Sequence, residues 1–441
     1  MPASPARAAA FTILLRVERE SAYAVELLHS ALLDVLSSED RNLTMEIVMG
    51  VLRWRSALDT TFAGFLPRAV NKLDLEVLTA LRMGTYQMAF LTRIPIHAVV
   101  NETVELVNQA RKRSASGMVN AVMRKLKPTP NLDPYASNLT GLGYLTAGLA
   151  HPEWLAKRWM ENFGYGRADL ICSYDQNIPA TALRLSRSED EEELVRSGIQ
   201  LTPGALMQNA RRVKAGDVTG TEFLRSGKVA IQDEGSQLVA ALVGSGKRIL
   251  DCCAAPGGKT AALAAALPEA EIVAAELHPH RARLLRQMAP QANVQVVIAD
   301  ALQLPYGADF DRVLADVPCS GSGTLARNPE IKWRLTLEDI HDLQSRQIAI
   351  LAAAMKHVSP GGRLIYSTCS LEPEENEHVV DACLRNNEFK VMPVKSELLR
   401  LQESGVLVWK NLDGLVSGDF LRTIPGAQPC DGFFAAILER Q

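Results

Sequence analysis

The chain has 441 residues, of which 47% are apolar and 22% charged, and its formal net charge is −3. A chain of this length is longer than one hydrophobic core usually supports, so two or three domains are expected. The composition is that of a globular protein, with no internal repeat or low-complexity tract. The near-neutral charge gives no global signal for nucleic acid, although a local basic patch is enough to bind RNA.

The seven cysteines have neither the spacing of a disulfide scaffold nor that of a C-x-x-C metal site. We therefore expect a reducing, cytoplasmic environment and no metal. A short apolar run at 8–15 is followed by charged residues instead of a cleavage site, which predicts an amphipathic helix and not a signal peptide. No apolar run approaches membrane-spanning length, so no membrane partner is expected.

Up to about Leu126 the apolar residues recur at helical spacing. The stripes are Phe11, Leu14 and Leu15; Leu43, Ile47, Val51 and Trp54; Val77, Leu81, Gly84 and Met88; and Val100, Val104 and Val107. This pattern predicts an all-α bundle over residues 1–130. Basic residues at 111–113 and 124–127 lie near its end. Alone they indicate a solvated face, and beside a nucleic-acid function they are candidate phosphate contacts.

A proline-rich stretch at 127–134 suits a linker. Beyond it, residues 145–231 predict a small α+β domain that links the two larger ones and contributes to RNA binding. Pro152 opens a helix, and the alternation at 181–186 and 228–231 is typical of strands. Arg211, Arg212 and Lys214 supply basic charge there.

From residue 232 to the end, strand-like and helix-like stretches alternate. Short apolar runs end near residues 250, 276, 298, 315 and 366, and helices are expected between them, the longest over 337–357. Further strands are expected at 406–409 and 433–438. Alternation of this kind predicts a doubly wound, Rossmann-like α/β sheet, here a catalytic domain over residues 232–441.

The first strand of this domain runs into a glycine turn, 254–259, that opens a helix and offers free backbone N–H groups to a ligand. A phosphate-binding P-loop needs glycine where Cys253 stands, and the dinucleotide fingerprint G-x-G-x-x-G is absent. S-adenosyl-L-methionine (SAM) needs an open turn and an acid for its ribose. Glu276 is placed for the ribose hydroxyls and Asp300 for the adenine amino group, although each acid alone could be a strand end or a helix cap.

Two cysteines follow predicted strand ends: Cys319 in Asp-Val-Pro-Cys-Ser and Cys369 in Ser-Thr-Cys-Ser. Ligands of open α/β sheets bind at these ends, so both thiols are expected to face one pocket. A thiolate that adds to carbon 6 of cytosine makes carbon 5 nucleophilic enough to accept a methyl group. Asp316 suits the acid that contacts the pyrimidine ring nitrogen. The spacing leaves open which cysteine attacks.

These residues resemble the RNA cytosine-5 methyltransferase family (Sun/Fmu, or NOL/NOP2/Sun) from about His151 onward. The matching motifs are Gln232-Asp233-Glu234-Gly235-Ser236, Cys253-Ala254-Ala255-Pro256-Gly257-Gly258-Lys259-Thr260, Asp316-Val317-Pro318-Cys319-Ser320-Gly321 and Ser367-Thr368-Cys369-Ser370. The amino-terminal helical region is similar to NusB, an RNA-binding fold. The fusion resembles the bacterial members of the family that act on small-subunit ribosomal RNA.

The resemblance implies a role for each matching residue. Cys369 would be the nucleophile, Cys319 would assist product release, and Asp316 would contact the cytosine. The residues that would bind SAM are Cys253, Ala254, Ala255, Pro256, Gly257, Gly258, Lys259, Glu276, Asp300 and Asp316. Two positions depart from the family pattern: Glu276 replaces a common aspartate, and Ala326 begins a stretch that is more basic in relatives.

The leading hypothesis is therefore a SAM-dependent enzyme that forms 5-methylcytosine in small-subunit (16S) ribosomal RNA. The same chemistry on transfer RNA is the nearest alternative. A different class is an RNA-binding assembly or antitermination factor whose methyltransferase domain is silent. Nothing in the sequence demands more than a monomer.

Overall fold

The computed structural model describes residues 3–127, 138–187, 189–384 and 388–441. It divides into two compact units: Met1–Ile178 with Leu325–Arg334, and Pro179–Thr324 with Leu335–Gln441. These units do not correspond one-to-one to the three expected domains, whose boundaries stay a prediction. Most of the proline-rich stretch, 128–134, lies outside the described residues.

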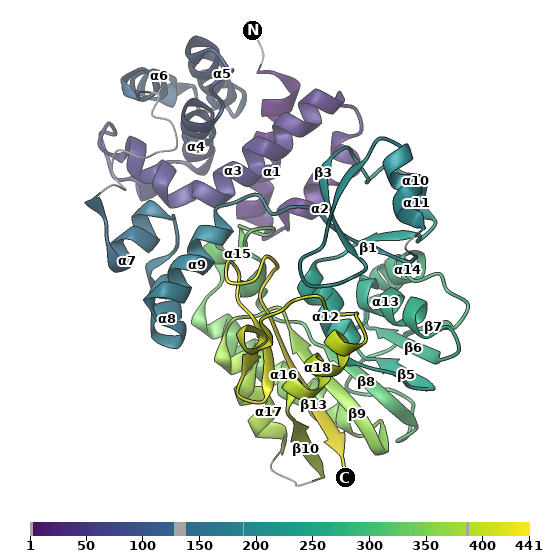
Figure 1. Ribbon diagram of the computed structural model, residues 1–441. Helices are drawn as coiled ribbons and strands as arrows, with labels where there is room; N and C mark the ends of the chain where they lie inside the picture. Colours follow the sequence, from purple (N-terminus) through teal and green to yellow (C-terminus); the bar gives the residue numbers. More distant parts are fainter. Residues whose placement is uncertain (1–2, 128–137, 188, 385–387) are drawn as a thin grey trace. The chain divides into compact units, whose positions relative to one another are not determined.

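The first unit begins with helices whose apolar stripes form one core. They are α1 (Pro5–Glu20), α2 (Ala24–Leu28), α3 (Ser38–Ala63), α4 (Leu75–Phe90), α5 (Ile96–Gln109) and α6 (Ser116–Lys125), drawn from purple to blue in Figure 1. Leu14, Ile47, Val51, Leu81 and Val107 are all buried in that core. The helical spacing of the apolar residues thus predicted the bundle correctly.

Later segments complete this unit. They are α7 (Gly141–Gly143), α8 (Glu153–Phe163), α9 (Tyr165–Asp175) and α15 (Ile331–Arg334). The last belongs to the segment 325–334, which follows Cys319 in the sequence but belongs to the first unit. Arg53 Nη2 donates to the Ala326 carbonyl at 2.9 Å, and Trp333 Nε1 donates to the Leu52 carbonyl at 2.5 Å. The segment is therefore held by hydrogen bonds to α3.

The second unit contains a small antiparallel sheet of strand order β2-β3-β1-β4. Its strands are β1 (Ala182–Leu185), β2 (Gln200–Pro203), β3 (Ala210–Ala215) and β4 (Val229–Ile231), and it carries α10 (Asp190–Arg196) and α11 (Glu222–Arg225). Leu183, Leu194 and Val229 belong to its separate small core. The strands expected at 181–186 and 228–231 are present, whereas the helix that Pro152 opens lies in the first unit.

The large sheet has the order β11-β12-β13-β9-β8-β5-β6-β7, with β10 paired to β13. Its parallel strands are β5 (Arg248–Asp251), β6 (Glu271–Glu276), β7 (Val294–Ile298), β8 (Phe310–Asp316) and β9 (Val358–Thr368). The antiparallel strands are β10 (Phe389–Met392), β11 (Val416–Ser417), β12 (Phe420–Thr423) and β13 (Phe433–Arg440). The strand order reverses at β5, which is where doubly wound folds bind their ligands.

Helices cover both faces of this sheet, because alternate strand residues point to opposite sides. Ile249, Leu314 and Ile365 belong to a core with α12 (Glu234–Leu242), α13 (Gly258–Ala266) and α18 (Val394–Glu403). Their neighbours Leu250, Val313 and Leu364 belong to a core with α16 (Leu337–Met355) and α17 (Glu377–Cys383). The remaining helix, α14 (Pro279–Met288), packs through Leu285 against Ala274 of β6. The expected doubly wound fold is confirmed.

One expected strand is wrong. Residues 406–409 form no strand, and only Leu407 makes an isolated bridge, to Met207. The backbone N–H groups of Val406 and Leu407 both donate to the Leu401 carbonyl and so close the end of α18. The other late strand, at 433–438, lies within β13. None of the helices that the structure describes is both long enough and apolar enough to cross a membrane.

Candidate active site

The glycine turn lies between β5 and α13, at the reversal of strand order. Gly257 has φ +117°, a conformation that side-chain-bearing residues rarely adopt. A Cβ there would also lie 3.0 Å from Leu285 Cδ1 and 3.1 Å from Met288 Cβ of α14. The position therefore requires glycine, because the turn packs against α14 at the N-terminus of α13.

Asp251 ends β5 directly below this turn. Thr260 Oγ1 donates to Asp251 Oδ2 at 2.8 Å, which ties the first turn of α13 to the strand. Burial raises the pKa of Asp251 to about 7, and the nearby Asp316 charge adds to this, while the Thr260 hydrogen bond opposes it. Burial also raises the pKa of the neighbouring Cys253 thiol. A raised pKa lowers the fraction of reactive thiolate at neutral pH.

Glu276 ends β6, the neighbour of β5, and Asp300 follows β7, the next strand along the sheet. Glu276 Oε1 accepts from the His278 N–H at 2.8 Å, and Asp300 Oδ1 accepts from the Leu302 N–H at 2.9 Å. Each acid therefore stabilises its own turn with one oxygen, which is the structural role that the sequence left open. These backbone contacts use one oxygen of each acid, and Glu276 Oε2 lies 3.9 Å from Arg281 Nη1.

Lys259 connects the turn to β8. Its Nζ lies 2.7 Å from Asp316 Oδ2, while Asp316 Oδ1 accepts from Ser367 Oγ at 2.7 Å. Burial acts to lower the pKa of Lys259, but the charge and hydrogen bond of Asp316 outweigh it, so the pKa is raised. The ammonium group therefore stays charged and fixes the Asp316 carboxylate between the glycine turn and β9.

The two cysteines lie together beyond β8 and β9. These strands are parallel neighbours, with Asp316 opposite Ser367 in the register. Cys319 Sγ is 3.3 Å from Cys369 Sγ, and both side chains are partly accessible. The hydrogen bond to Cys369 raises the pKa of Cys319 well above its ordinary value, and burial adds to the effect. The structure brings the two thiols together, while their separate roles stay predictions.

Sequence reasoning missed the residues beneath this pair. Ser320 and Ser370, which follow the two cysteines, both donate through Oγ to the buried carboxylate of Glu375. Gln347 of α16 donates to the same carboxylate at 2.9 Å. The serine after each cysteine was visible in the sequence, but the acid and the amide come from other elements.

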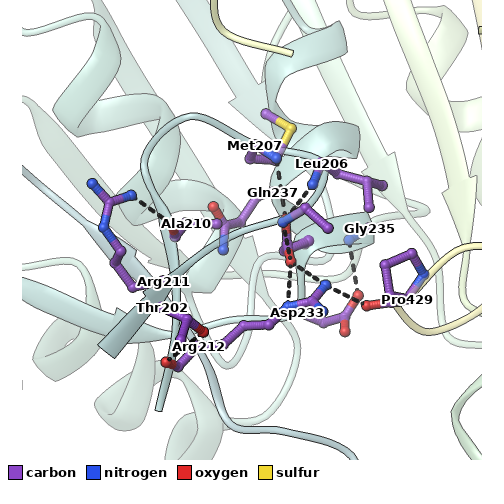
Figure 2. A network of polar contacts seen from close by, with 12 residues as sticks. Thr202, Leu206, Met207, Ala210, Arg211, Arg212, Asp233, Gly235, Gln237 and Pro429 are labelled. Carbon is purple, nitrogen blue, oxygen red and sulfur yellow. Dashed lines mark hydrogen bonds and ion pairs between the residues drawn. The ribbon is translucent and has the colours of Figure 1, made fainter. Parts of the chain in front are cut away.

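The motif Gln232-Asp233-Glu234-Gly235-Ser236 has a structural role. Asp233 caps α12 by accepting from the Gly235 N–H at 2.8 Å. The buried Glu234 carboxylate accepts from the N–H groups of Leu206 and Met207 at 2.6 and 3.1 Å and from Arg212. Figure 2 shows Leu206, Met207 and Arg212 gathered at the start of α12, where Arg212 also reaches the Pro429 carbonyl at 2.8 Å.

The arginines of the small sheet, which were expected to contact RNA, are paired with acids of the protein. Arg212 is occupied by Glu234, and Arg211 forms two hydrogen bonds of 2.7 Å with Glu191. These two arginines therefore stabilise the small sheet within the protein. Ala326, the departure from the basic family pattern, is itself buried, so its side chain does not form an exposed surface.

Comparison with known proteins agrees with this architecture. The profile of the 16S rRNA methyltransferase RsmB/F family matches residues 241–439, and that of the NusB family matches residues 4–128. The probable ribosomal RNA small subunit methyltransferase B of Bacillus subtilis is 30% identical to the chain over 100% of both sequences. The chain belongs to the RsmB/F family. The corresponding protein of Vibrio cholerae is 31% identical over 91% of the chain and 90% of its own length.

Solved structures agree with the RsmB/F assignment at the level of fold. The crystal structure of PH0851 covers 100% of both chains with a TM-score of 0.79 at 22% identity. A methyltransferase homolog from Pyrococcus horikoshii covers 69% of this chain and 100% of its own, with a TM-score of 0.56 at 27% identity. The glycine turn and cysteine pair described above both fall in the RsmB/F match.

Proposed function

We propose that the protein is a SAM-dependent methyltransferase that forms 5-methylcytosine in small-subunit ribosomal RNA, with Cys369 as nucleophile. Membership of the RsmB/F family supports methyl transfer to 16S rRNA. The observation that carries the cytosine-5 chemistry is the 3.3 Å separation of the Cys319 and Cys369 thiols next to the Lys259–Asp316 pair. Methylation of an amino group needs no thiol at all.

The residues of the glycine turn suit SAM. The turn at Gly257 has no room for a side chain, and the acids at the ends of β6 and β7 are held by backbone N–H groups at 2.8 and 2.9 Å. Residues 253–259 would hold the methionine end, with Glu276 at the ribose, Asp300 at the adenine and Asp316 beside the reacting centre. When bound there, SAM supplies an electrophilic methyl group.

Cys369, Asp316 and Cys319 then carry out different steps of the reaction. The Cys369 thiolate forms a bond to carbon 6 of cytosine, and the electron pair of the 5,6 double bond moves to carbon 5, which takes the methyl group. Asp316 acts in its protonated form, donating a hydrogen bond to the ring nitrogen where negative charge develops, and Lys259 Nζ, 2.7 Å from Asp316 Oδ2, holds the side chain in place. A base then takes the carbon 5 proton, the electron pair of that C–H bond restores the 5,6 double bond, and the bond to Cys369 breaks to return its thiolate; Cys319 assists this release.

The test uses purified protein, SAM and unmodified small-subunit ribosomal RNA, followed by mass spectrometry of the nucleosides. We expect 5-methylcytidine with the wild type and none with Cys369→Ala. Cys383→Ala is the matched control, because Cys383 lies on α17 with its thiol bonded to the Ile348 carbonyl. Product on transfer RNA instead of ribosomal RNA would reassign the substrate. SAM binding without methylated cytidine in either RNA would contradict the proposal.

A further inference from the structure

A single buried carboxylate connects the loops that carry the two cysteines. Glu375 follows β9, and its side chain is fully buried. Its Oε1 accepts from the Ser320 N–H at 2.8 Å and from Gln347 Nε2 at 2.9 Å. Its Oε2 accepts from Ser320 Oγ at 2.5 Å and from Ser370 Oγ. An ionised carboxylate has about four acceptor sites, so these four donors satisfy it completely.

The partners of Glu375 make this arrangement specific to the cysteine pair. Ser320 and Ser370 directly follow Cys319 and Cys369, and their hydroxyl oxygens are 3.1 Å apart. The carboxylate therefore holds the two loops close together, so that the serine hydroxyls are neighbours in the same way as the thiols. Hydrogen bonds to a buried charged group are stronger than neutral ones, so this connection is stiff.

Surrounding contacts fix both loops in the same geometry. Gln347 also donates to the Pro318 carbonyl at 2.9 Å, one residue before Cys319. The Gly323 N–H donates to the Cys369 carbonyl at 2.9 Å, which ties one loop to the other through the backbone. A Cβ on Gly323 would lie 2.4 Å from the Gly432 oxygen, so this close approach depends on glycine. The loops have little freedom to separate while Glu375 is in place.

We propose that Glu375 is a positioning residue that sets the separation of Cys319 and Cys369, so that addition and release act on the same cytosine. This inference rests on the proposed cytosine-5 mechanism. Glu375 is not itself a catalytic residue, because it is fully buried and both of its oxygens are occupied by the protein. Its effect passes through Ser320 and Ser370.

The first test compares Glu375→Ala with Glu375→Gln in methyl transfer. A displacement of about 1 Å at a reacting group costs on the order of 100-fold in rate, so Glu375→Ala should lower kcat by about that factor. The KM for RNA and the Kd for SAM should stay within about twofold. A glutamine oxygen can still accept from Ser320 and Gln347, and its amide can donate to the serine hydroxyls. Glu375→Gln should therefore stay within about tenfold of the wild type.

The second test does not depend on methylation. The RNA-free protein is treated with diamide, which removes two electrons and two protons from a pair of thiols and becomes a hydrazine, leaving a disulfide. The rate of the Cys319–Cys369 crosslink is followed by peptide mass spectrometry. We expect the wild type and Glu375→Gln to crosslink readily and Glu375→Ala at least about tenfold more slowly. Because this crosslink needs neither SAM nor RNA, it separates failure of this inference from failure of the proposed function.

The control is Glu397→Gln. Glu397 is also a buried acid of this unit, but it pairs with Arg363 and Arg400 at α18. It should change neither the crosslinking rate nor kcat. If Glu375→Ala loses SAM binding, it has unfolded, and Ser370→Ala, which removes one donor, takes its place and should slow crosslinking by a smaller factor. Unchanged crosslinking and kcat in the folded variant would overturn the inference.

Discussion

Lys332 carries an amino group into the interior of the first unit. Its side chain is 1% exposed, and its Nζ has no hydrogen-bond partner in the described ranges, although it lies 5.1 Å from the Trp333 ring centre. Burial lowers the pKa of Lys332 to about 7, with Arg53 adding to the effect and Asp175 opposing it. A buried amine of this kind costs stability whenever the surrounding solution favours its charged form.

We predict that Lys332→Met stabilises the protein at neutral pH by a few kcal/mol, on the order of 1.4 kcal/mol per pKa unit. The folded pKa of about 7 lies below the unfolded one, so the unfolded chain binds more protons between these values. The Lys332 contribution to wild-type stability should therefore become less favourable as pH falls toward 7 and stay constant below that pH. The gain in Lys332→Met should be largest at pH 7 and below and vanish near pH 10.

Urea unfolding of both proteins at pH 6, 7 and 9 measures this difference. A loss of stability in Lys332→Met at pH 7 would mean that the ammonium has a strong partner in the folded protein.

At the scale of elements, α12 and the small sheet share the buried Glu234 carboxylate. The carboxylate accepts from three backbone N–H groups and from Arg212, so its removal leaves several buried donors without a hydrogen-bond acceptor. Each buried donor left without an acceptor costs roughly 1–3 kcal/mol of stability. The start of α12 thus depends on the loop between β2 and β3, a dependence that local sequence does not reveal.

We predict that Glu234→Ala lowers the free energy of unfolding by at least about 3 kcal/mol. Thermal unfolding followed by circular dichroism is the measurement. Glu193→Ala is the control, since Glu193 and its partner Lys228 are both exposed and their pair contributes little. Equal melting temperatures for the two variants would show that the Glu234 contacts do not stabilise the fold.

An element could be predicted when its structure is decided by the sequence near it and not by tertiary contacts. The parallel strands β6 and β7 were predicted with their observed ends, because their apolar runs are closed by turn residues. Residues 406–409 have the same local pattern, but the backbone N–H groups of Val406 and Leu407 are used to close α18. Cys319 and Cys369 could be grouped from strand ends alone. Glu375 and Gln347 could not, because only the folded chain brings α16 and the turn after β9 to the same point.

At the scale of the whole molecule, a net charge of −3 makes RNA binding a matter of local basic surface. Arg111, Arg113, Arg124, Lys125 and Lys127 at the end of the helical bundle are exposed. In contrast, Lys112 lies 3.1 Å from Asp74 Oδ2, and Arg211 and Arg212 are paired with acids. The exposed Arg113, Arg124 and Lys125 are therefore better placed for phosphate contacts than Lys112, Arg211 and Arg212.

We predict that Arg113→Glu, Arg124→Glu and Lys125→Glu together weaken ribosomal RNA binding. Each lost phosphate contact lowers the slope of log K against log salt by about 0.7–0.9, so three should lower it by about 2–3. Filter binding across a salt series measures the slope. Lys356→Glu, Lys390→Glu and Lys395→Glu, which are exposed in the second unit and change the charge equally, form the control. The same loss in both triple variants would indicate a net-charge effect.

The measurement that tests the central claim most directly is the fate of the protein–RNA bond when Cys319 is removed. Cys319→Ala, incubated with SAM and substrate RNA, should accumulate a covalent adduct that survives denaturing electrophoresis and maps to Cys369. The double variant Cys319→Ala, Cys369→Ala should form none. The single variant Cys369→Ala should also form none, and an adduct in it that maps to Cys319 would reverse the assigned roles of the two thiols. No adduct in any variant, while the wild type still makes 5-methylcytidine, would contradict the covalent mechanism itself.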